Sequence, residues 1–282
     1  MTSMATGEQT REFVFEDNHF ELLRTLAREN VGIELNDTKR ALVYGRLTRR
    51  LRALQLDNFD DYCRLLSKPN SPEMTEFVNS ITTNVTAFFR EPHHFDFLKD
   101  VALPHLLKSR PDRRLRMWSA AASTGQEPYS IAASAAEVLG PQSDWDCKIL
   151  ATDIDSEALA RGEAGLYSAQ DVPDDLGSQR RWFNPTSSGG YQMDKALQEM
   201  LFFRQLNLMG PWPMSGKIDV IFCRNVVIYF SVETQRRLFS RFAEIIAPDG
   251  YLFIGHSESM LHSADLFTMV GRTIYRPAGT AG

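Results

Sequence analysis

The segment LRMWSAAASTGQEPYS, residues 115–130, predicts a strand, a loop of small residues and a helix in direct succession. The apolar residues 115–118 favour a short buried strand, and Pro128 falls in the first helical turn, where a missing N–H is tolerated. Thr124 and Glu127 have the spacing of a capping box, so we expect Thr124 to cap the helix. A doubly wound α/β domain forms its ligand crevice with this order of elements, at the carboxyl end of the first strand.

A second buried strand is expected at residues 147–153, CKILATD, and it ends at Asp153. An acidic residue in that place commonly binds ribose hydroxyls. The loop before the helix holds one glycine, Gly125, and no GxGxxG motif, so it is poorly suited to a pyrophosphate. Glu127 at the helix start suits a ligand that carries a positive group. The crevice therefore favours S-adenosylmethionine over a nicotinamide dinucleotide.

Three segments together resemble the bacterial chemotaxis-receptor methyltransferases, the CheR family. They are SAAASTGQEPYS at residues 119–130, ITTNVTAFFRE at 81–91 and IFCRNVVIYF at 221–230. The resemblance runs from about Phe20 to Tyr275, and Ala122 stands where many relatives have cysteine. It implies transfer of a methyl group from S-adenosylmethionine to glutamate side chains on receptor signalling helices, with S-adenosylhomocysteine as the other product.

Composition sets the broad class. The 282 residues carry a net charge of -5, with 43% hydrophobic and 24% charged residues, as in an ordinary globular protein and unlike a nucleic-acid binder. Cys63, Cys147 and Cys223 lack metal-ligand spacing, so we expect no metal site and a reducing compartment. No secretory or membrane-spanning pattern is present. We expect a cytoplasmic monomer that does not insert into membranes.

The domain plan follows from hydrophobic periodicity. We expect a flexible N-terminus at residues 1–15, an all-helical domain at 16–81, a linker at 82–91 and a methyltransferase domain at 92–282. Helical spacing with breaks at 31–32, 57–58 and 67–72 predicts four helices in the first domain. The second is expected to have the α/β fold of a class I (Rossmann-like) methyltransferase, with a mainly parallel sheet and one antiparallel strand near its edge.

Residues 166–205 interrupt the α/β alternation and predict a small antiparallel β insertion. We expect a helix from Asp171 to near Phe183, and a ribbon that pairs residues 191–193 with 200–205. Further on, a strand is expected at 217–223, a helix at 232–247 ended by a turn at 248–250, and final strands at 251–255 and 273–276. The segment from Phe183 to Asn207 is shorter than in family members that dock a receptor-tail peptide, so we expect no dependence on such a tail.

Positive charge gathers on the expected helix at residues 36–55. Lys39, Arg46, Arg49 and Arg50 fall on or near one stripe, opposite an apolar face. Such a stripe is often only a solvated surface. In an acidic protein it also suits a glutamate-rich receptor helix, and the resemblance favours this second interpretation.

The resemblance also implies the site residues. Arg90 and Tyr229 would hold the acceptor carboxylate, although Tyr229 also fits a packing role. The expected cofactor contacts are Asn84, Thr86, Arg90, Gly125, Glu127, Asp153, Asn207, Leu208, Arg224 and Asn225. A glutamate with a pKa of about 4.3 is already ionised at neutral pH, so no general base is needed. His256 is not expected to act in catalysis.

Two other functions remain open from the sequence. A non-catalytic sensor would bind S-adenosylmethionine and signal through its helical domain, but the presence of both Arg90 and Tyr229 argues against it. A nicotinamide oxidoreductase is disfavoured because the glycine fingerprint is missing.

Overall fold

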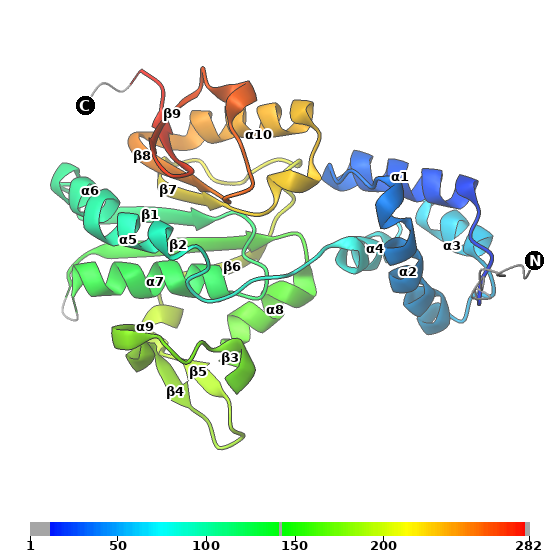
Figure 1. Cartoon of the computed structure of the whole chain (residues 1–282), viewed down its shortest axis with the longest axis horizontal. Helices are drawn as coiled ribbons and strands as arrows, with labels where there is room; N and C mark the ends of the chain where they lie inside the picture. The colour runs from blue at the N-terminus through cyan, green and yellow to red at the C-terminus, as the bar shows by residue number, and fades with distance from the viewer. Residues whose placement is uncertain (1–11, 141–142, 280–282) are drawn as a thin grey trace, which may run out of the picture. The chain divides into compact units, whose positions relative to one another are not determined.

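The computed structural model describes residues 12–140 and 143–279, and the chain divides into two compact units after Thr82 (Figure 1). Phe15 is buried against Phe59, with ring centroids 4.5 Å apart, so the expectation of a flexible N-terminus is wrong for Phe15. Residues 1–11 of that expectation lie outside the described residues. In the described ranges, every helix is too short or too polar to cross a bilayer.

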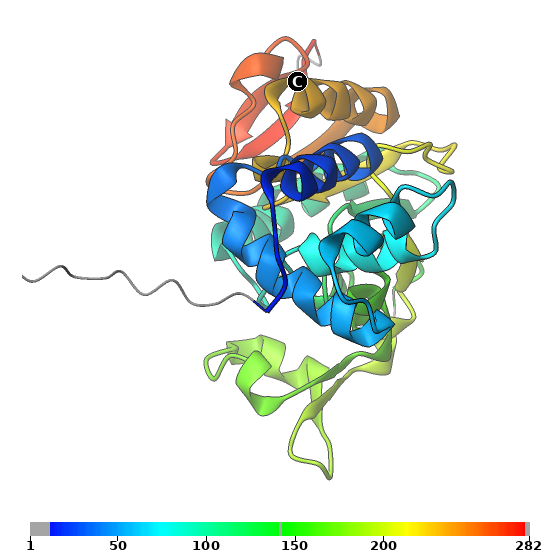
Figure 2. The same cartoon turned by 90° about the vertical axis from the view of Figure 1, so that its right-hand side faces the viewer.

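The first unit contains the four predicted α-helices, drawn in blue to cyan in Figure 2. They are α1 (Asp17–Val31), α2 (Arg40–Leu54), α3 (Phe59–Leu66) and α4 (Glu73–Ile81), with a 3-10 turn η1 (Asp37–Lys39) before α2. Gly32 ends α1 in the left-handed conformation, at φ 75°, which glycine adopts without strain. Their core consists of fully buried apolar side chains, among them Leu23, Leu47, Phe59 and Phe77.

The basic residues of this unit do not form one uniform stripe. Lys39 lies in η1 and is half-buried, and burial lowers its pKa. Arg46 donates to the carbonyls of Ser80 (3.1 Å) and Thr82 (2.6 Å). Arg50 makes a two-point ion pair with buried Glu73, at 2.8 and 2.7 Å. Arg49 is exposed, so the four residues differ in how far they can serve a partner.

The second unit contains a seven-stranded sheet in the order β6-β2-β1-β7-β8-β10-β9. Neighbouring strands from β6 to β8 pair in parallel, whereas β10 is antiparallel to both β8 and β9. This confirms the expected mainly parallel sheet with one antiparallel strand near the edge. The strands are β1 (Arg114–Ser119), β2 (Asp146–Asp153), β6 (Leu201–Gln205), β7 (Ile218–Cys223), β8 (Ile246–Ile254), β9 (Phe267–Gly271) and β10 (Ile274–Pro277).

Helices cover both faces of this sheet (Figure 1). On one face lie α5 (Pro92–Phe97), a π-helical turn η2 (Leu98–Ala102), α6 (Leu103–Ser109) and α7 (Gln126–Leu139); on the other lies α10 (Val232–Ile245). Phe95 of α5 stacks on Phe222 of β7 at 5.9 Å, and Phe242 of α10 contacts Trp118 of β1 at 5.4 Å. Because side chains alternate between the two faces of a strand, the sheet contributes apolar side chains to the core on both faces. A further helix, α8 (Ser156–Ala164), follows β2.

The insertion differs from the expected ribbon. Strands β3 (Leu166–Tyr167), β5 (Tyr191–Met193) and β4 (Phe183–Pro185) form a three-stranded antiparallel sheet, and the β4–β5 hairpin projects from the unit in Figures 1 and 2. Residues 201–205 do not pair with 191–193; they form β6, parallel to β2. That pairing was missed because it closes the exposed edge of β2 through contacts distant in sequence. Residues 194–200 between them contain the short helix α9 (Lys195–Gln198).

Two other expectations for this unit are wrong. The helix from Asp171 to Phe183 is absent, and two 3-10 segments, η3 (Ala169–Asp171) and η4 (Gly177–Trp182), stand in its place. Pro173 and Gly177 lie between or within them, and both residues disfavour a regular helix. Residues 248–250 do not form the expected turn between helix and strand, because α10 ends at Ile245 and β8 already begins at Ile246. These three residues bulge within β8, where the register jumps from Ile218↔Ile246 to Val220↔Tyr251, and a bulge tolerates Pro248.

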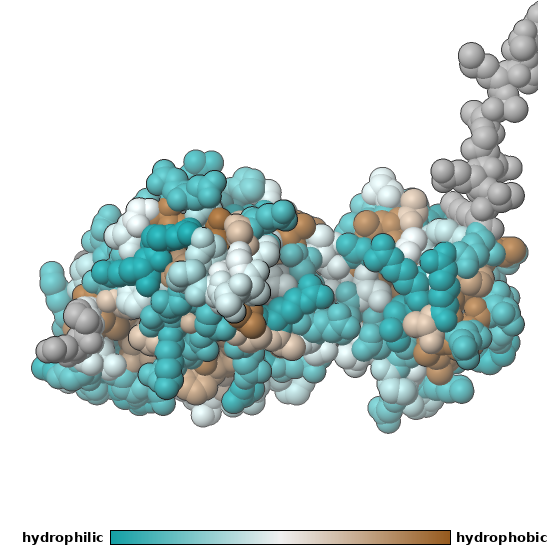
Figure 3. Space-filling model, turned by 90° about the horizontal axis from the view of Figure 1, so that it is seen from below, coloured by the Kyte–Doolittle hydropathy of each residue, from teal (hydrophilic) through white to brown (hydrophobic). Residues whose placement is uncertain are grey.

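The surface seen in Figure 3 shows small apolar areas separated by hydrophilic residues. Singly exposed apolar side chains of this kind are normal on a folded protein.

Cys63, Cys147 and Cys223 are all buried free thiols, as small core residues would be.

Candidate active site

The candidate site is the region at the carboxyl ends of β1, β2 and β7, where a loop of small residues leads into α7, and we refer to this region as the crevice. Ala120 N–H donates to the carbonyl of Phe222 (2.8 Å), and Ala122 N–H to that of Thr152 (2.9 Å). The loop is therefore fixed to both strands that flank β1. This confirms the predicted strand, loop and helix, at the edge of the sheet where such domains bind ligands.

The helix cap differs from the prediction. Gly125, not Thr124, is the N-cap of α7, at φ 98°, and the Thr124 hydroxyl bonds to the side chain of Gln126. A Cβ at position 125 would lie 2.6 Å from the Tyr167 hydroxyl and 2.8 Å from Gly162 Cα. Only glycine combines that positive φ with so close an approach. The Glu127 carboxylate accepts from Ser119 and Arg224.

Asp153 is held at the end of β2 by backbone donors. Its carboxylate accepts from Ser123 N (2.8 Å) and Asp155 N (3.0 Å), and burial raises its pKa although these bonds oppose the shift. The hydroxyl oxygen of Ser123 is buried, and it has no hydrogen-bond partner in the part of the chain that the structure describes. Asn84 donates to Asp155 (2.6 Å). A carboxylate with free lone pairs next to an unsatisfied hydroxyl suits the hydroxyls of a ribose.

The pairing of β6 with β2 places the residues that follow both strands side by side. Leu206 N–H donates to the carbonyl of Asp153 (2.9 Å). Asn207 comes next and is half-buried, and its side chain accepts from Met209 N (2.9 Å). Leu208 is buried, and its carbonyl accepts from Arg241 (2.5 Å). An apolar side chain is thus available close to the ribose position.

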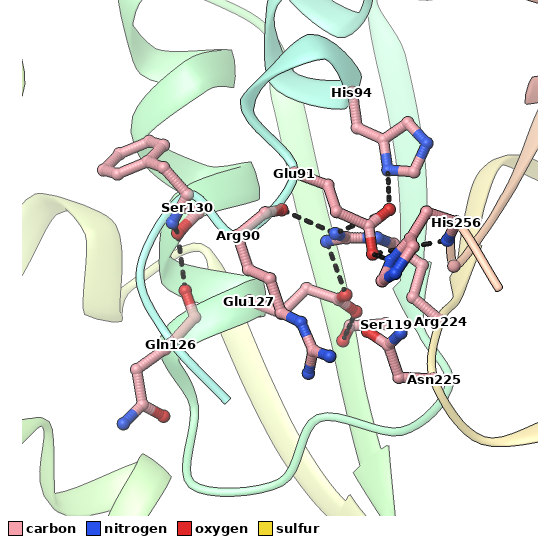
Figure 4. Close-up of polar contacts among 12 residues, drawn as sticks. Arg90, Glu91, His94, Ser119, Gln126, Glu127, Ser130, Arg224, Asn225 and His256 are labelled. Carbon is pink, nitrogen blue, oxygen red and sulfur yellow. Dashed lines mark hydrogen bonds and ion pairs between the residues drawn. The ribbon is translucent and has the colours of Figure 1, made fainter. Parts of the chain in front are cut away.

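A buried ion cluster occupies the other half of the crevice (Figure 4). Arg224, after β7, contacts Glu127 at 3.1 Å and Glu91 at 3.4 Å, and donates to the Arg90 carbonyl at 2.5 Å. Glu127 also accepts from the Ser119 hydroxyl (2.8 Å). Burial raises the pKa of Glu127, and the charge of Arg224 opposes that shift. Arg224 therefore ties the linker to the start of α7.

Glu91 links this cluster to two histidines. Its carboxylate accepts from His256 Nδ1 (2.8 Å) and lies 3.5 Å from His94 Nδ1. Burial raises the pKa of Glu91, but the hydrogen bond from His256 and the charge of Arg224 outweigh it and bring the pKa to about 2. Burial, Arg224 and His93 lower the pKa of His94 to about 3. At neutral pH the site thus holds a carboxylate and a neutral imidazole.

Several residues around the crevice have a left-handed backbone, as some residues elsewhere in the chain also do. Phe89, Glu91, Ser123 and Asn225 have φ values of 52°, 60°, 49° and 59°. Non-glycine residues in the left-handed region cost free energy, and such residues cluster at functional sites.

One possible metal-ligand group occurs among residues 12–140 and 143–279. It consists of Glu91, His93 and His94, whose ligand atoms lie within 4.8 Å of one another. Arg224 and His256 already compensate the charge of Glu91. Because the Arg224 guanidinium would repel a cation at this point, the geometry gives a metal little support.

The remaining expected residues lie on two segments, the linker before α5 and the stretch after β7. Arg90 donates from its side chain to the Val85 carbonyl (2.8 Å), and Thr86 is half-buried on the same linker. Asn225 directly follows Arg224, and half-buried Tyr229 ends the 3-10 turn η5 (Val227–Tyr229). His256 is half-exposed beside Glu91.

Sequence reasoning missed three residues that build the site: Glu91, Ser119 and Glu258. Glu258 is buried, and its carboxylate accepts N–H bonds from three backbone positions after β7 and β8. The segment HSES after a strand end was the available signal, but it drew attention to His256 rather than to Glu258.

These groups fit S-adenosylmethionine. Asp153 and Ser123 match a ribose, and the buried carboxylate of Glu127 matches a positively charged aminoacyl end. A pyrophosphate would meet the buried carboxylate of Glu127 at this loop. Binding would be unfavourable, because an anion needs a cluster of N–H donors there and not a second negative charge.

Comparison with known proteins supports the same cofactor. Residues 84–276 match the family model described as "CheR methyltransferase, SAM binding domain", and residues 18–82 match "CheR methyltransferase, all-alpha domain". A "Probable chemotaxis protein methyltransferase" of Rhizobium etli is 44% identical over 254 residues, which cover 88% of this chain and 95% of that protein. "Chemotaxis protein methyltransferase 2" of Pseudomonas aeruginosa is 42% identical, covering 95% and 96%. "Chemotaxis protein methyltransferase" of Escherichia coli is 41% identical, covering 95% and 93%. The chain therefore belongs to the CheR methyltransferase family, and its cofactor is S-adenosylmethionine.

Proposed function

We propose that this protein methylates glutamate side chains of chemoreceptors and forms glutamyl methyl esters. The buried Arg224–Glu127–Glu91 cluster at the carboxyl edge of the sheet is the observation that carries the proposal, together with relatives described as chemotaxis protein methyltransferases. A carboxylate acceptor is ionised at neutral pH, so this crevice needs to position and desolvate it but not to deprotonate it.

Arg90 and Tyr229 are proposed to hold the acceptor carboxylate. A desolvated carboxylate requires strong donors, and a guanidinium and a phenolic hydroxyl are both suitable. The carbonyl of Arg90 is fixed by Arg224 at 2.5 Å, which anchors the linker from which its side chain extends. When bound, S-adenosylmethionine supplies a methyl group on a sulfonium.

The cofactor contacts are assigned by position. Asp153 would bind the ribose, with Asn84 and Thr86 alongside, and Gly125 would allow close backbone approach. Glu127 would face the aminoacyl end, and Asn207 and Leu208 would flank the adenine. Arg224 and Asn225 would form the floor, with Arg224 acting through its protein partners.

The cofactor assignment is tested by Asp153→Ala. Loss of a charged hydrogen-bond acceptor should weaken S-adenosylmethionine binding by about 1.5–3 kcal/mol. Calorimetric titration measures this directly, with circular dichroism as a check on folding. Unchanged affinity in a folded variant would show that the ribose lies elsewhere.

The reaction itself is tested by radiolabelled methyl transfer onto receptor cytoplasmic fragments. We expect incorporated label to be released as methanol in mild base, because a carboxylate ester hydrolyses under conditions in which an N-methyl group is stable. Label that survives base would contradict a glutamyl ester. Binding of S-adenosylmethionine without transfer to any receptor fragment would favour the sensor alternative.

The receptor partner is proposed to bind α2 and its flanking turn. Lys39, Arg46, Arg49 and Arg50 remain the candidate residues, with exposed Arg49 the most available. Arg49→Glu should raise KM for the receptor, leave S-adenosylmethionine affinity unchanged and weaken the salt dependence of receptor binding. Receptor kinetics indifferent to this reversal and to salt would mean that the surface is only solvated.

We also propose that methylation does not depend on a receptor-tail peptide. The edge strands of the small sheet, β3 and β4, have two and three residues, and Pro185 in β4 offers no N–H donor. Such short edges accept an added strand poorly. Removing the receptor C-terminus should leave the methylation rate nearly unchanged, whereas calorimetric binding of a tail peptide would refute independence.

A further inference from the structure

The segment that follows β7 has an irregular backbone. Asn225 has φ 59°, Val226 has φ -121° and ψ -37°, and Val227–Tyr229 form one 3-10 turn. N–H groups in such a segment have no place in a helix or sheet ladder, and a buried N–H without an acceptor is costly. Some other group must therefore hold this conformation.

Glu258 supplies the acceptors. Its Oε2 accepts from Asn225 N (3.0 Å) and Gly255 N (2.5 Å), and its Oε1 accepts from Val227 N (2.9 Å). The side chain is buried, with 6% of its surface exposed. One carboxylate thus joins the loop after β7 to the loop after β8.

Gly255 makes that junction possible. A Cβ at position 255 would lie 2.6 Å from Asn225 Nδ2, 2.9 Å from Asn225 N and 2.9 Å from Glu258 Oε2. Real Cβ atoms do not approach other atoms so closely, so any side chain here would push the two loops apart. The close contact between the loops after β7 and β8 therefore requires glycine at position 255.

We propose that Glu258 is a positioning residue for methyl transfer, which sets the place of the Tyr229 hydroxyl by fixing the backbone of residues 225–227. This inference rests on the proposed role of Tyr229 at the acceptor carboxylate. The Glu258 carboxylate is buried and directed at backbone N–H donors, so we assign it an indirect role. Glu258 also holds Asn225, which is assigned to the cofactor floor, so kcat at saturating S-adenosylmethionine isolates the effect that passes through Tyr229.

The test is a double-mutant cycle on kcat at saturating S-adenosylmethionine and receptor. Glu258→Gln replaces an acceptor oxygen by an amide N–H that faces backbone donors, and should lower kcat by about 10- to 100-fold, the scale of an active-site misplacement. In a Tyr229→Phe background the same change should cost less than about threefold, because the hydroxyl that it misplaces is already absent.

Asp219→Asn is the matched control. Asp219 is buried to the same extent, at 6% exposed, but its carboxylate pairs with Arg110 (2.7 Å) and accepts from Arg116 N (2.7 Å). It lies near the amino end of β7, at the opposite end of that strand from Arg224. Its loss should lower stability and have the same effect on kcat with or without the Tyr229 hydroxyl.

Should Glu258→Gln fail to fold, Gly255→Ala and Glu258→Asp replace it, since both disturb the same junction while keeping the charge. A kcat unchanged in folded variants, or a loss of equal size in both backgrounds, overturns the inference. If Tyr229→Phe alone leaves kcat unchanged, the catalytic role of Tyr229 fails and the inference fails with it. A loss with Tyr229→Phe that does not couple to Glu258 overturns the inference alone.

Discussion

Two arginine–carboxylate clusters, one in each unit, use the same chemistry to different ends. In the helical unit Arg50 meets Glu73 through two hydrogen bonds, and Glu73 also accepts from the Tyr62 hydroxyl (3.1 Å). In the methyltransferase unit Arg224 is shared among Glu127, Glu91 and the Arg90 carbonyl. The first cluster is closed, with each charged group facing its partner.

The second cluster is left incomplete. Glu91 Oε2, His94 Nδ1, His93 Nε2 and Arg224 Nε are buried without a hydrogen-bond partner among the described residues. Unsatisfied buried groups are unfavourable, and native structures keep few of them. The saturated Arg50–Glu73 ion pair therefore supports the fold. The Arg224 cluster, which keeps unsatisfied donors and acceptors beside strained backbone, marks the functional site.

Arg224→Met tests the incomplete cluster. Removing a guanidinium whose side chain is 2% exposed leaves Glu127 and Glu91 without their shared cation. The cost should be about 3–5 kcal/mol of unfolding free energy, with loss of S-adenosylmethionine binding. Denaturant unfolding and calorimetry measure the two effects. Retained cofactor affinity in the folded variant would show that the cluster is structural only.

Arg50→Met tests the closed cluster. It leaves Glu73, which is 5% exposed, without its ion pair and should cost about 2–4 kcal/mol of unfolding free energy while S-adenosylmethionine affinity stays unchanged. Arg49→Met on the same helix is the control and should change stability by less than about 0.5 kcal/mol, because that residue is exposed. Equal costs for the two variants would contradict the assignment.

A pH titration tests the incomplete cluster, to which both His94 and Glu91 belong. The pKa of His94 is about 3 when folded, below its unfolded value of about 6.5, so the unfolded chain binds the extra proton. Stability is therefore lost as pH falls below the unfolded pKa, at about 1.4 kcal/mol per unit. Glu91 has a lowered pKa of about 2, so its contribution is present above about pH 4.5 and is lost only below that.

The measurement compares wild type with His94→Gln at pH 7.5 and pH 5. The wild type should lose about 2 kcal/mol more than the variant over this interval, which lies above the range where Glu91 titrates. Parallel losses in the two proteins would mean that His94 is protonated in the folded state.

The smallest effect concerns the start of α7, beside Glu127. Thr124→Ala should cost less than about 0.5 kcal/mol of stability, because Gly125 caps this helix and Thr124 does not. Ser231→Ala is the matched control, since the Ser231 side chain accepts from Thr234 N (3.2 Å) as the true N-cap of α10, and it should cost about 1 kcal/mol. The opposite ranking would restore Thr124 as a cap.

Local sequence signals predicted a large part of this structure. Apolar periodicity and turn residues placed the four helices of the first unit and the strands β1, β2 and β7, because those signals are local. The motifs around residues 81–91, 119–130 and 221–230 identified the family and the crevice. Asp153 could be placed at the strand end from the pattern of CKILATD alone.

The remaining features depend on contacts between residues distant in sequence. Positions far apart in sequence meet in three places: β6 pairs with β2, Arg224 contacts three partners, and Glu258 accepts from the backbone of residues 225–227. Local pattern cannot specify which distant partner satisfies a buried charge or N–H group. It also could not separate Arg50 from Arg49, since neighbours on a charged helix differ only in what the fold brings beside them.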